Sequence, residues 1–426
     1  MKRYIRLFLI VFSALSASCT FEEANIFPES AAIRLENAQK EYNDILCAAS
    51  NGWVMEYFPT DTTKGVTLLM KFNSSKSVMI AAKSALTSNV YTKDSSLFEI
   101  ITDNGPVLTF NTYNKVFHIY SNPQDPAGGS YLNGIGLGGD YEFIVLSADE
   151  NQVKLKGKKR GTYIYLNRLA DNQLWPDYFT KIEAMNTTIF DNAPNNLYLV
   201  SGLDTVVAYF GSTQKFQIAK FNEDPIVNGE THSFIVTPTG IRFHTPYIFN
   251  EKSLQTFTLS DNLQQLKCTD PDNTAYFTGP MPGNFYATDN TKTWNFVFTK
   301  PMGTKFNLVY NRILASCQSV LKEKFTNMYL KYYGLRNSYT LSFKSGKYTG
   351  YYDFKRTNLG ENKVKFEYMG TADANGNYYK NSIDGFNDLI LYMGQSFTVS
   401  SDNALNLNVI KFSAVADPDI SFYLSL

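Results

Sequence analysis

The sequence predicts an α+β protein in which antiparallel β-meanders, each preceded by an amphipathic helix, form three related units. Aromatic residues make up 15% of the chain, with 29 Tyr and 32 Phe, and such side chains favour strands. Short apolar runs separated by turn residues recur along the chain, as in hairpins joined in series. Stretches with helical apolar spacing begin near residues 30, 176 and 305. A single continuous sheet interrupted by helices is the alternative.

The first helix is predicted to begin after Ser30, a residue type suited to capping a helix N-terminus, and to end at Asn51-Gly52. Leu35, Tyr42 and Leu46 then share one helical face. Strands are predicted after this helix over 53–58, 66–72, 78–83, 97–102, 107–110, 116–120, 141–146, 153–155 and 163–166.

The helix-then-strands pattern repeats twice more. A second helix is predicted over 176–190 and a third over 305–322, from apolar residues at helical spacing. The predicted units therefore cover 30–172, 173–300 and 301–426. Strands are predicted in the second unit over 197–200, 206–210, 216–221, 233–237 and 240–243, and in the third over 329–333, 339–343, 348–354, 364–369, 389–393 and 405–412.

The chain begins with the features of a lipoprotein signal peptide over residues 1–18. A basic pair precedes an apolar run over 7–12, which is too short to span a bilayer, and small residues lead into Cys19. Cys19 is therefore the predicted site of diacylglycerol attachment, and 19–29 the predicted tether. An ordinary signal cleavage beside an incidental Cys is the alternative.

Charge and cysteine content narrow the classes of partner. Lys+Arg and Asp+Glu balance at 39 each, so no nucleic-acid partner is expected, and membrane attachment is expected through the lipid anchor alone. With Cys19 lipidated, the odd number left, Cys47, Cys268 and Cys317, indicates no disulfide framework. Free thiols are expected, with one disulfide among the three as the alternative.

No motif of a known catalytic chemistry is found. His118, His232 and His244 do not lie at metal-ligand spacing, and no Gly-x-Ser-x-Gly sequence is present. We therefore expect neither an enzyme nor a cofactor or metal site, although a carboxylate pair cannot be located from sequence. The segments 270–273 and 373–377 are expected to be turns rather than cation sites.

Two segments are candidates for ligand binding. Gly136, Gly138, Gly139 and Asp140 precede a predicted strand rather than a helix, which argues against a phosphate-binding loop. A flexible surface loop is expected there. The alternative is that bare backbone lets a sugar or peptide approach closely.

The second candidate is the Tyr-rich part of the C-terminal unit. Tyr348, Tyr351 and Tyr352 present flat rings with polar tips, which suit sugar or protein contacts, although structural roles are expected for most of them. The basic run over 154–160 is expected to be the solvated edge of a sheet, with a contact to an acidic partner as the alternative.

Several segments together are similar to one lipoprotein family. They are Cys19 with Glu22-Glu23, Ser30–Leu35, Asn51–Tyr57, Leu108–Asn114 and Gly138–Phe143. They resemble, over nearly the whole mature chain, the Bacteroides-type lipoproteins grouped as domain of unknown function 4302. In this resemblance, Glu22 and Glu23 correspond to the acidic signal that sorts such lipoproteins to the outer face of the outer membrane.

The resemblance implies a cell-surface, outer-membrane lipoprotein encoded among TonB-dependent, starch-utilisation-type transporters and their companion lipoproteins. We therefore expect an accessory component of nutrient uptake that binds a peptide or glycan, or that docks onto the transporter and its companion lipoprotein. An aromatic-lined cleft near either candidate segment would favour binding. A cell-surface hydrolase using carboxylates, or a structural or adhesion lipoprotein, is the alternative.

Overall fold

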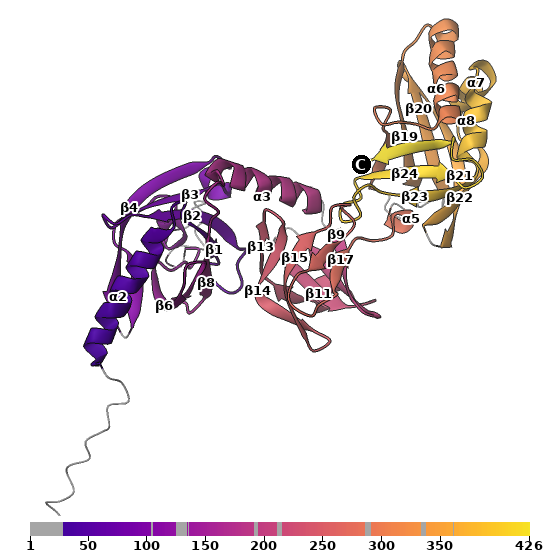
Figure 1. The fold of residues 1–426 in the computed structure, drawn as a ribbon. Helices are drawn as coiled ribbons and strands as arrows, with labels where there is room; N and C mark the ends of the chain where they lie inside the picture. The colour runs from indigo at the N-terminus through magenta and orange to yellow at the C-terminus, as the bar shows by residue number, and fades with distance from the viewer. Residues whose placement is uncertain are drawn as a thin grey trace, which may run out of the picture.

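The computed structural model describes residues 29–426 except 104, 125–133, 135, 191–194, 211–214, 286–290, 334–337 and 361. The signal peptide, Cys19, Glu22 and Glu23 lie outside the described residues. Three antiparallel sheets follow one another along the chain, with the middle sheet between two barrels (Figure 1). Strands account for 44% and helices for 22%, which confirms a β-rich chain of three units. Among the described helices, none is both long and apolar enough to cross a membrane.

The first unit is a closed eight-stranded barrel that follows one helix, α2 (Ala31–Ala48). The side chain of Ser30 accepts a hydrogen bond from the backbone of Ile33, so the predicted cap is confirmed. Trp53 is fully buried, and its Nε1 donates to the carbonyl of Leu46 at 2.9 Å, which fastens the end of the helix to the barrel. The strands are β1 (Trp53–Tyr57), β2 (Val66–Phe72), β3 (Ser77–Ala82), β4 (Thr92–Thr102), β5 (Pro106–Phe110), β6 (Glu142–Ala148), β7 (Gln152–Gly157) and β8 (Tyr163–Arg168).

Two predictions for this unit are wrong. The segment 116–120 is not a strand but a turn ending in the short helix η2 (His118–Tyr120). Asn114 Oδ1 accepts from the backbone of Val116 and Phe117, and this local bonding replaces a strand ladder. The basic run is not a sheet edge either, because β7 is paired with β6 and β8 inside a closed barrel.

The middle unit is a nine-stranded sheet preceded by α3 (Trp175–Phe190), close to the predicted 176–190. Two meanders, β9 to β12 and β13 to β17, join through the pairing of β9 with β17. The short helix α4 (Pro225–Asn228) connects β11 to β12. The strands are β9 (Asn195–Ser201), β10 (Asp204–Phe210), β11 (Phe216–Lys220), β12 (Glu230–His232), β13 (Phe234–Thr237), β14 (Gly240–Phe249), β15 (Lys252–Leu259), β16 (Leu266–Cys268) and β17 (Tyr276–Thr278).

The C-terminal unit is a second closed eight-stranded barrel. Its first strand precedes the helix α6 (Thr304–Ser316) and pairs with the second and last strands, so the third sheet begins before the predicted boundary at residue 300. The strands are β18 (Thr293–Phe296), β19 (Phe325–Tyr333), β20 (Ser338–Ser345), β21 (Tyr348–Gly360), β22 (Lys363–Thr371), β23 (Ser396–Ser400), β24 (Val409–Ala414) and β25 (Ser421–Ser425).

Three segments of this barrel differ from expectation. The predicted strand 405–412 begins only at Val409, and residues 405–408 belong to a loop. The predicted strand 389–393 is part of the helix α8 (Phe386–Met393), because Phe386, Leu389, Ile390 and Met393 are buried at helical spacing. The predicted turn 373–377 begins the helix α7 (Ala374–Ser382), capped by Asp373, which accepts from the backbone of Gly376.

The first and middle units meet along β1, β8, β13 and β14. The backbone N–H of Gly65 donates to the carbonyl of Phe234. The ring centroids of Phe58 and His244 lie 4.2 Å apart. Arg242 on β14 forms an ion pair with Glu56 on β1, and both side chains are largely buried. Charge, stacking and backbone contacts therefore couple these two units.

His244 makes this junction sensitive to pH. Its Nε2–H donates to the carbonyl of Tyr163 at 3.1 Å, and burial lowers the pKa of the imidazole below its usual value. The unfolded chain then binds a proton at His244 more readily than the folded chain, so stability is lost as the pH falls below about 6.5. We expect the urea midpoint to fall more between about pH 7.5 and 5.5 for wild type than for His244→Gln. Equal falls would contradict this.

Candidate functional site

The strongest candidate site is a pocket between the middle and C-terminal units, with a volume of about 610 Å³. The middle unit contributes Tyr198, Thr205, Phe221, Gln264 and Thr278, and the connection between units contributes Gly279, Pro280, Met281 and Pro282. The C-terminal unit contributes Asn362, Val399, Ser400, Ser401 and Ala404. Its size and position at a unit junction are typical of a small-molecule site. We call it the junction pocket.

The outer face of the middle sheet provides the floor of the junction pocket. On β9 the neighbours of Tyr198, Leu197 and Leu199, are fully buried in the core, so Tyr198 points to the opposite face. Tyr198 is paired with Thr278 on β17, which places their side chains together. The ring of Phe221 lies 6.1 Å from that of Tyr198, and Phe221 remains 54% exposed.

A loop of the C-terminal unit closes the other side of the junction pocket. Gln264 Nε2 donates to the carbonyls of Ser401 and Asp402, and Ala404 donates its N–H to Leu263. Leu405 is only 1% exposed and belongs to the core of the middle unit. The loop thus holds the C-terminal side of the junction pocket at a set distance from the face of the middle sheet.

Close packing at this loop requires a glycine in the connection between the units. A Cβ at Gly279 would clash with the backbone carbonyl of Ala404. Asn403 Nδ2 donates to the carbonyl of Thr188 at the end of α3, so the loop is also tied to that helix. The geometry of the junction pocket therefore depends on both units being docked.

The Gly-rich candidate segment lies elsewhere, at one end of the first barrel. Gly136, Gly138, Gly139 and Asp140 are buried, so the described part of this segment is not the expected surface loop. A Cβ at Gly139 would clash with the hydroxyl of Tyr57, which donates to the carbonyl of Asp140 at 3.0 Å. These glycines therefore have a packing role.

The carboxylate of Asp140 has a structural contact as well. It accepts a hydrogen bond from the backbone of Arg160 at 2.8 Å, and burial raises the pKa of Asp140. None of the described pockets is lined by the Gly-rich segment. Ligand binding by these four residues stays a prediction that the geometry does not support.

The three candidate tyrosines of the C-terminal unit do not form one surface. Tyr352 is fully buried inside the barrel and donates to the carbonyl of Gly376 at 2.9 Å. Tyr348 is exposed, and Tyr351 is half-buried on the outer face. The structure therefore brings these residues neither to one another nor to the Gly-rich segment.

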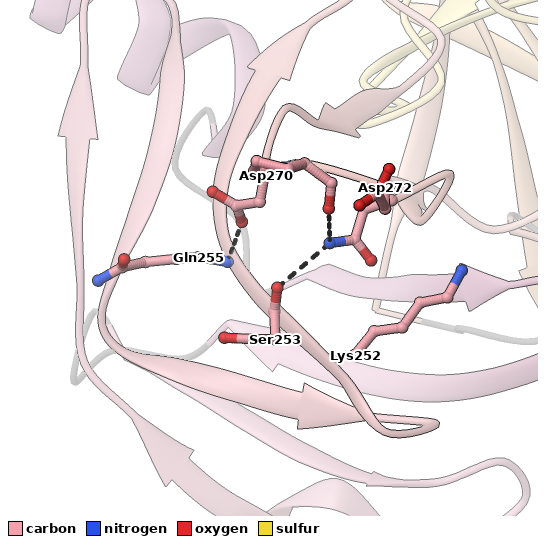
Figure 2. Close-up of a pocket in the computed structure, with 7 residues that line it drawn as sticks. Lys252, Ser253, Gln255, Asp270 and Asp272 are labelled. Atoms are coloured by element: carbon pink, nitrogen blue, oxygen red, sulfur yellow. Dashed lines mark hydrogen bonds between the residues drawn. The ribbon is translucent and has the colours of Figure 1, made fainter.

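A second described pocket, of about 450 Å³, surrounds the segment 270–273 beside β15. Figure 2 shows the carboxylate of Asp270 turned toward the backbone of Gln255, to which it is hydrogen bonded. Asp270 also accepts from the backbone of Thr256 at 3.0 Å. Asn273 Nδ2 donates to the carbonyls of Ser253 and Pro271. Asp270 and the Asn273 amide group thus hold a turn in place, and no cluster of possible metal ligands is found among the described residues.

The three described cysteines, Cys47, Cys268 and Cys317, are free thiols. Cys317 directly follows α6 and is buried in the core of the C-terminal barrel. This burial raises the pKa of its thiol. Burial also raises the pKa of Cys268 to about 11. Both thiols stay protonated at neutral pH. Cys317 packs as a small apolar residue, whereas the Cys268 thiol donates to the carboxylate of Asp270 at 3.4 Å.

Comparison with known proteins decides the family. A model of the family described as "Domain of unknown function (DUF4302)" matches residues 23–261, more than half of the chain. The chain belongs to the DUF4302 family. No curated protein sequence matches it.

Two solved structures align with most of this DUF4302 protein, but at very low sequence identity and TM-score. The β subunit of DNA polymerase from Streptococcus pyogenes is 10% identical, with 92% of this chain and 96% of that chain covered, at a TM-score of 0.13. The DNA polymerase III β subunit from Thermotoga maritima is 8% identical, with 91% and 96% covered, at a TM-score of 0.16. TM-scores this low show no shared arrangement.

The DUF4302 match covers less of the chain than the sequence segments suggested. It spans the first barrel and most of the middle sheet but ends at residue 261, before the C-terminal barrel. Tyr198, Thr205 and Phe221 therefore lie inside the matched region, and the other lining residues of the junction pocket lie outside it.

Sequence reasoning missed the aromatic residues of the junction pocket. Tyr198 lies in a strand that alternates in the ordinary way, and nothing in the sequence distinguishes its outer face from other sheet faces. The segment Gly279 to Pro282 gives no signal either, because a single apolar residue such as Met281, 57% exposed in the structure, is ordinary on a protein surface.

Proposed function

We propose that this DUF4302 protein is a surface-exposed outer-membrane lipoprotein, and an accessory ligand-binding component of a TonB-dependent, starch-utilisation-type uptake system. The junction pocket is the observation that carries the binding part of this proposal. It combines a mostly apolar surface with a few hydroxyl and amide groups, as ligand sites do. Family membership and the lipoprotein-type N-terminus support the cellular setting.

The proposed anchor explains how a chain with balanced charge stays at a membrane. Diacylglycerol on Cys19 inserts into the bilayer, so membrane attachment needs no apolar or basic patch on the protein surface. Glu22 and Glu23 then sort the lipoprotein to the outer face. The transporter and its companion lipoprotein are the proposed partners, and they bring the ligand pocket close to the entry channel.

We also infer that the three units are related helix-plus-meander repeats. In the first two units a helix, α2 or α3, comes directly before the first strand of the sheet. The third unit departs from this order in one strand, because β18 precedes α6, and α6 then comes before the other seven strands. The first and third units also share a closed meander of eight antiparallel strands.

Replacement of the anchor residue tests the cellular setting. We expect Cys19→Ser to move the protein from the outer-membrane fraction to the soluble fraction, because the lipid is no longer attached. The matched control Cys47→Ser, a change of a half-buried thiol, leaves the protein in the membrane. Fractionation of cells followed by immunoblotting measures both. Retention of Cys19→Ser in the membrane would contradict the anchor.

Affinity purification tests the proposed partners. We expect the lipidated wild-type protein, isolated from detergent-solubilised outer membranes, to carry a TonB-dependent transporter and its companion lipoprotein in a fixed ratio. Mass spectrometry identifies the co-purifying proteins. Recovery of the protein alone would remove the uptake complex from the proposal and leave a ligand-binding surface lipoprotein.

A further inference from the structure

We propose that the ligand of the junction pocket is an uncharged carbohydrate. This inference rests on the proposed function, because it names the chemical class that the same pocket takes. Charge, backbone pairing and the kind of lining side chain each narrow the choice of ligand.

Charge gives the first restriction. Among the described residues that line the junction pocket, none is Lys, Arg, Asp, Glu or His. An anionic sugar, a phosphate or a free peptide terminus would lose its hydration on entry without gaining an ion pair, and a charged group without a partner is costly to bury. The pocket therefore favours a ligand without net charge.

Backbone pairing gives the second restriction. The strands that line the pocket are β9, β10, β17 and β23, and each is paired with a neighbouring strand on both sides. An extended peptide is commonly recognised by adding a strand to a free sheet edge, and these strands offer none. A ligand in this pocket must therefore be recognised through side chains.

The lining side chains provide what a neutral sugar requires. Tyr198 and Phe221 place two aromatic rings next to each other, and the apolar face of a pyranose ring packs on such a surface. Thr205 and Ser400 supply hydroxyl groups. The hydroxyl of Thr278 donates to the carbonyl of Gln264 at 3.4 Å and can still accept, and Asn362 Oδ1 accepts from the backbone of Gly283, so the Asn362 amide contributes its Nδ2–H donors. Hydroxyls and amides both donate and accept hydrogen bonds, which matches the hydroxyl groups of a sugar.

Calorimetric titration of the full mature chain tests the ligand class. The probes are neutral oligosaccharides of glucose, mannose and xylose, oligogalacturonate as an acidic sugar, and peptides with blocked ends. We expect at least one neutral oligosaccharide to bind, and Phe221→Ala to weaken its binding about tenfold or more. Tyr198→Phe keeps the ring and stays close to wild type. Tyr113→Ala removes an exposed ring of the first unit and serves as the matched control.

Introduced charges test neutrality directly. For an uncharged ligand, Thr205→Lys and Thr205→Glu both weaken binding, and Thr205→Gln serves as the control for size. A ligand with charge would bind more tightly to one charged variant and more weakly to the other. Such an opposite response would overturn the inference.

The outcomes separate this inference from the proposed function. If oligogalacturonate or a blocked peptide binds, and Phe221→Ala removes that binding, the junction pocket is a ligand site but the carbohydrate class is wrong. If a neutral oligosaccharide binds equally to wild type and Phe221→Ala, the sugar binds outside the junction pocket, so this inference is overturned while a ligand-binding function of the protein stands. If no probe binds, both fall.

Discussion

Arg242→Met is expected to lower the free energy of unfolding by about 3–5 kcal/mol at neutral pH, because it leaves a buried carboxylate without its partner. Arg242 and Glu56 have side chains only 18% and 10% exposed. Burial raises the pKa of Glu56 even with the guanidinium beside it. Without Arg242 the ionised form of Glu56 is still less favourable, and the carboxyl group takes up a proton in the folded state.

The surroundings of this pair explain why the loss is large. Arg242 also lies over the ring of Tyr165, 4.9 Å from its centroid, and Asn167 donates to Glu56 at 3.3 Å. The guanidinium therefore contacts two strands of the first barrel from the middle sheet. Its removal breaks a contact between units as well as an ion pair.

Urea denaturation measures the loss of stability in Arg242→Met. Repeating it at lower pH shows whether protonation of Glu56 restores part of that stability. Because Glu56 is protonated more readily when folded than when unfolded, lowering the pH should recover part of the lost stability. The double variant Glu56→Gln/Arg242→Met should recover more, since no charge remains buried. Lys76→Met is the control, because Lys76 pairs with Glu99 on the exposed surface. An Arg242→Met protein as stable as wild type at neutral pH would contradict the account.

Leu405→Ala is the second change with a large expected effect, about 2–5 kcal/mol of stability. Leu405 belongs to the loop of the C-terminal unit but lies in the core of the middle unit, at 1% exposure. Removing its branched end leaves a cavity between units that neighbouring side chains cannot fill fully. The loss should appear as weaker docking of the two units.

Leu405→Ala should also weaken ligand binding, although Leu405 itself does not contact the ligand. Leu405 does not line the junction pocket, whereas Ala404 beside it does. Looser docking then widens the pocket and separates its walls. Leu203→Ala, a change at a fully exposed leucine, is the matched control. Thermal unfolding measures stability, and calorimetric titration with an oligosaccharide that binds wild type measures affinity. An unchanged melting temperature and affinity in Leu405→Ala would contradict this role of the loop.

Much of the fold could be predicted from local patterns. The helix α3 lies within one residue of the predicted range 176–190, because its apolar residues recur at helical spacing. The helix α2 begins after Ser30 as predicted but ends at Ala48, before the predicted end at Asn51-Gly52. The strand Val66–Phe72 was predicted with its bounds, since its apolar and β-branched residues stand between turn signals. Closure of two sheets into barrels was not predicted, because pairing of first and last strands is not local.

The errors arose where a local pattern has two solutions. The run from Leu389 to Met393 fits a buried strand or a short buried helix, and only its neighbours Phe386 and Gly385 favour the helix. The junction pocket could not be predicted at all. Its walls come from segments about 200 residues apart, such as Tyr198 and Val399, which meet only after the units dock.

Hydrogen–deuterium exchange of the mature protein, with and without a bound neutral oligosaccharide, tests the central claim most directly. The account predicts slower exchange on both sides of the junction pocket together, around Tyr198 and Phe221 in the middle unit and around Ser400 to Ala404 in the C-terminal unit. Slower exchange confined to the Gly136–Asp140 segment or to Tyr348–Tyr352, with none at the junction, would contradict it.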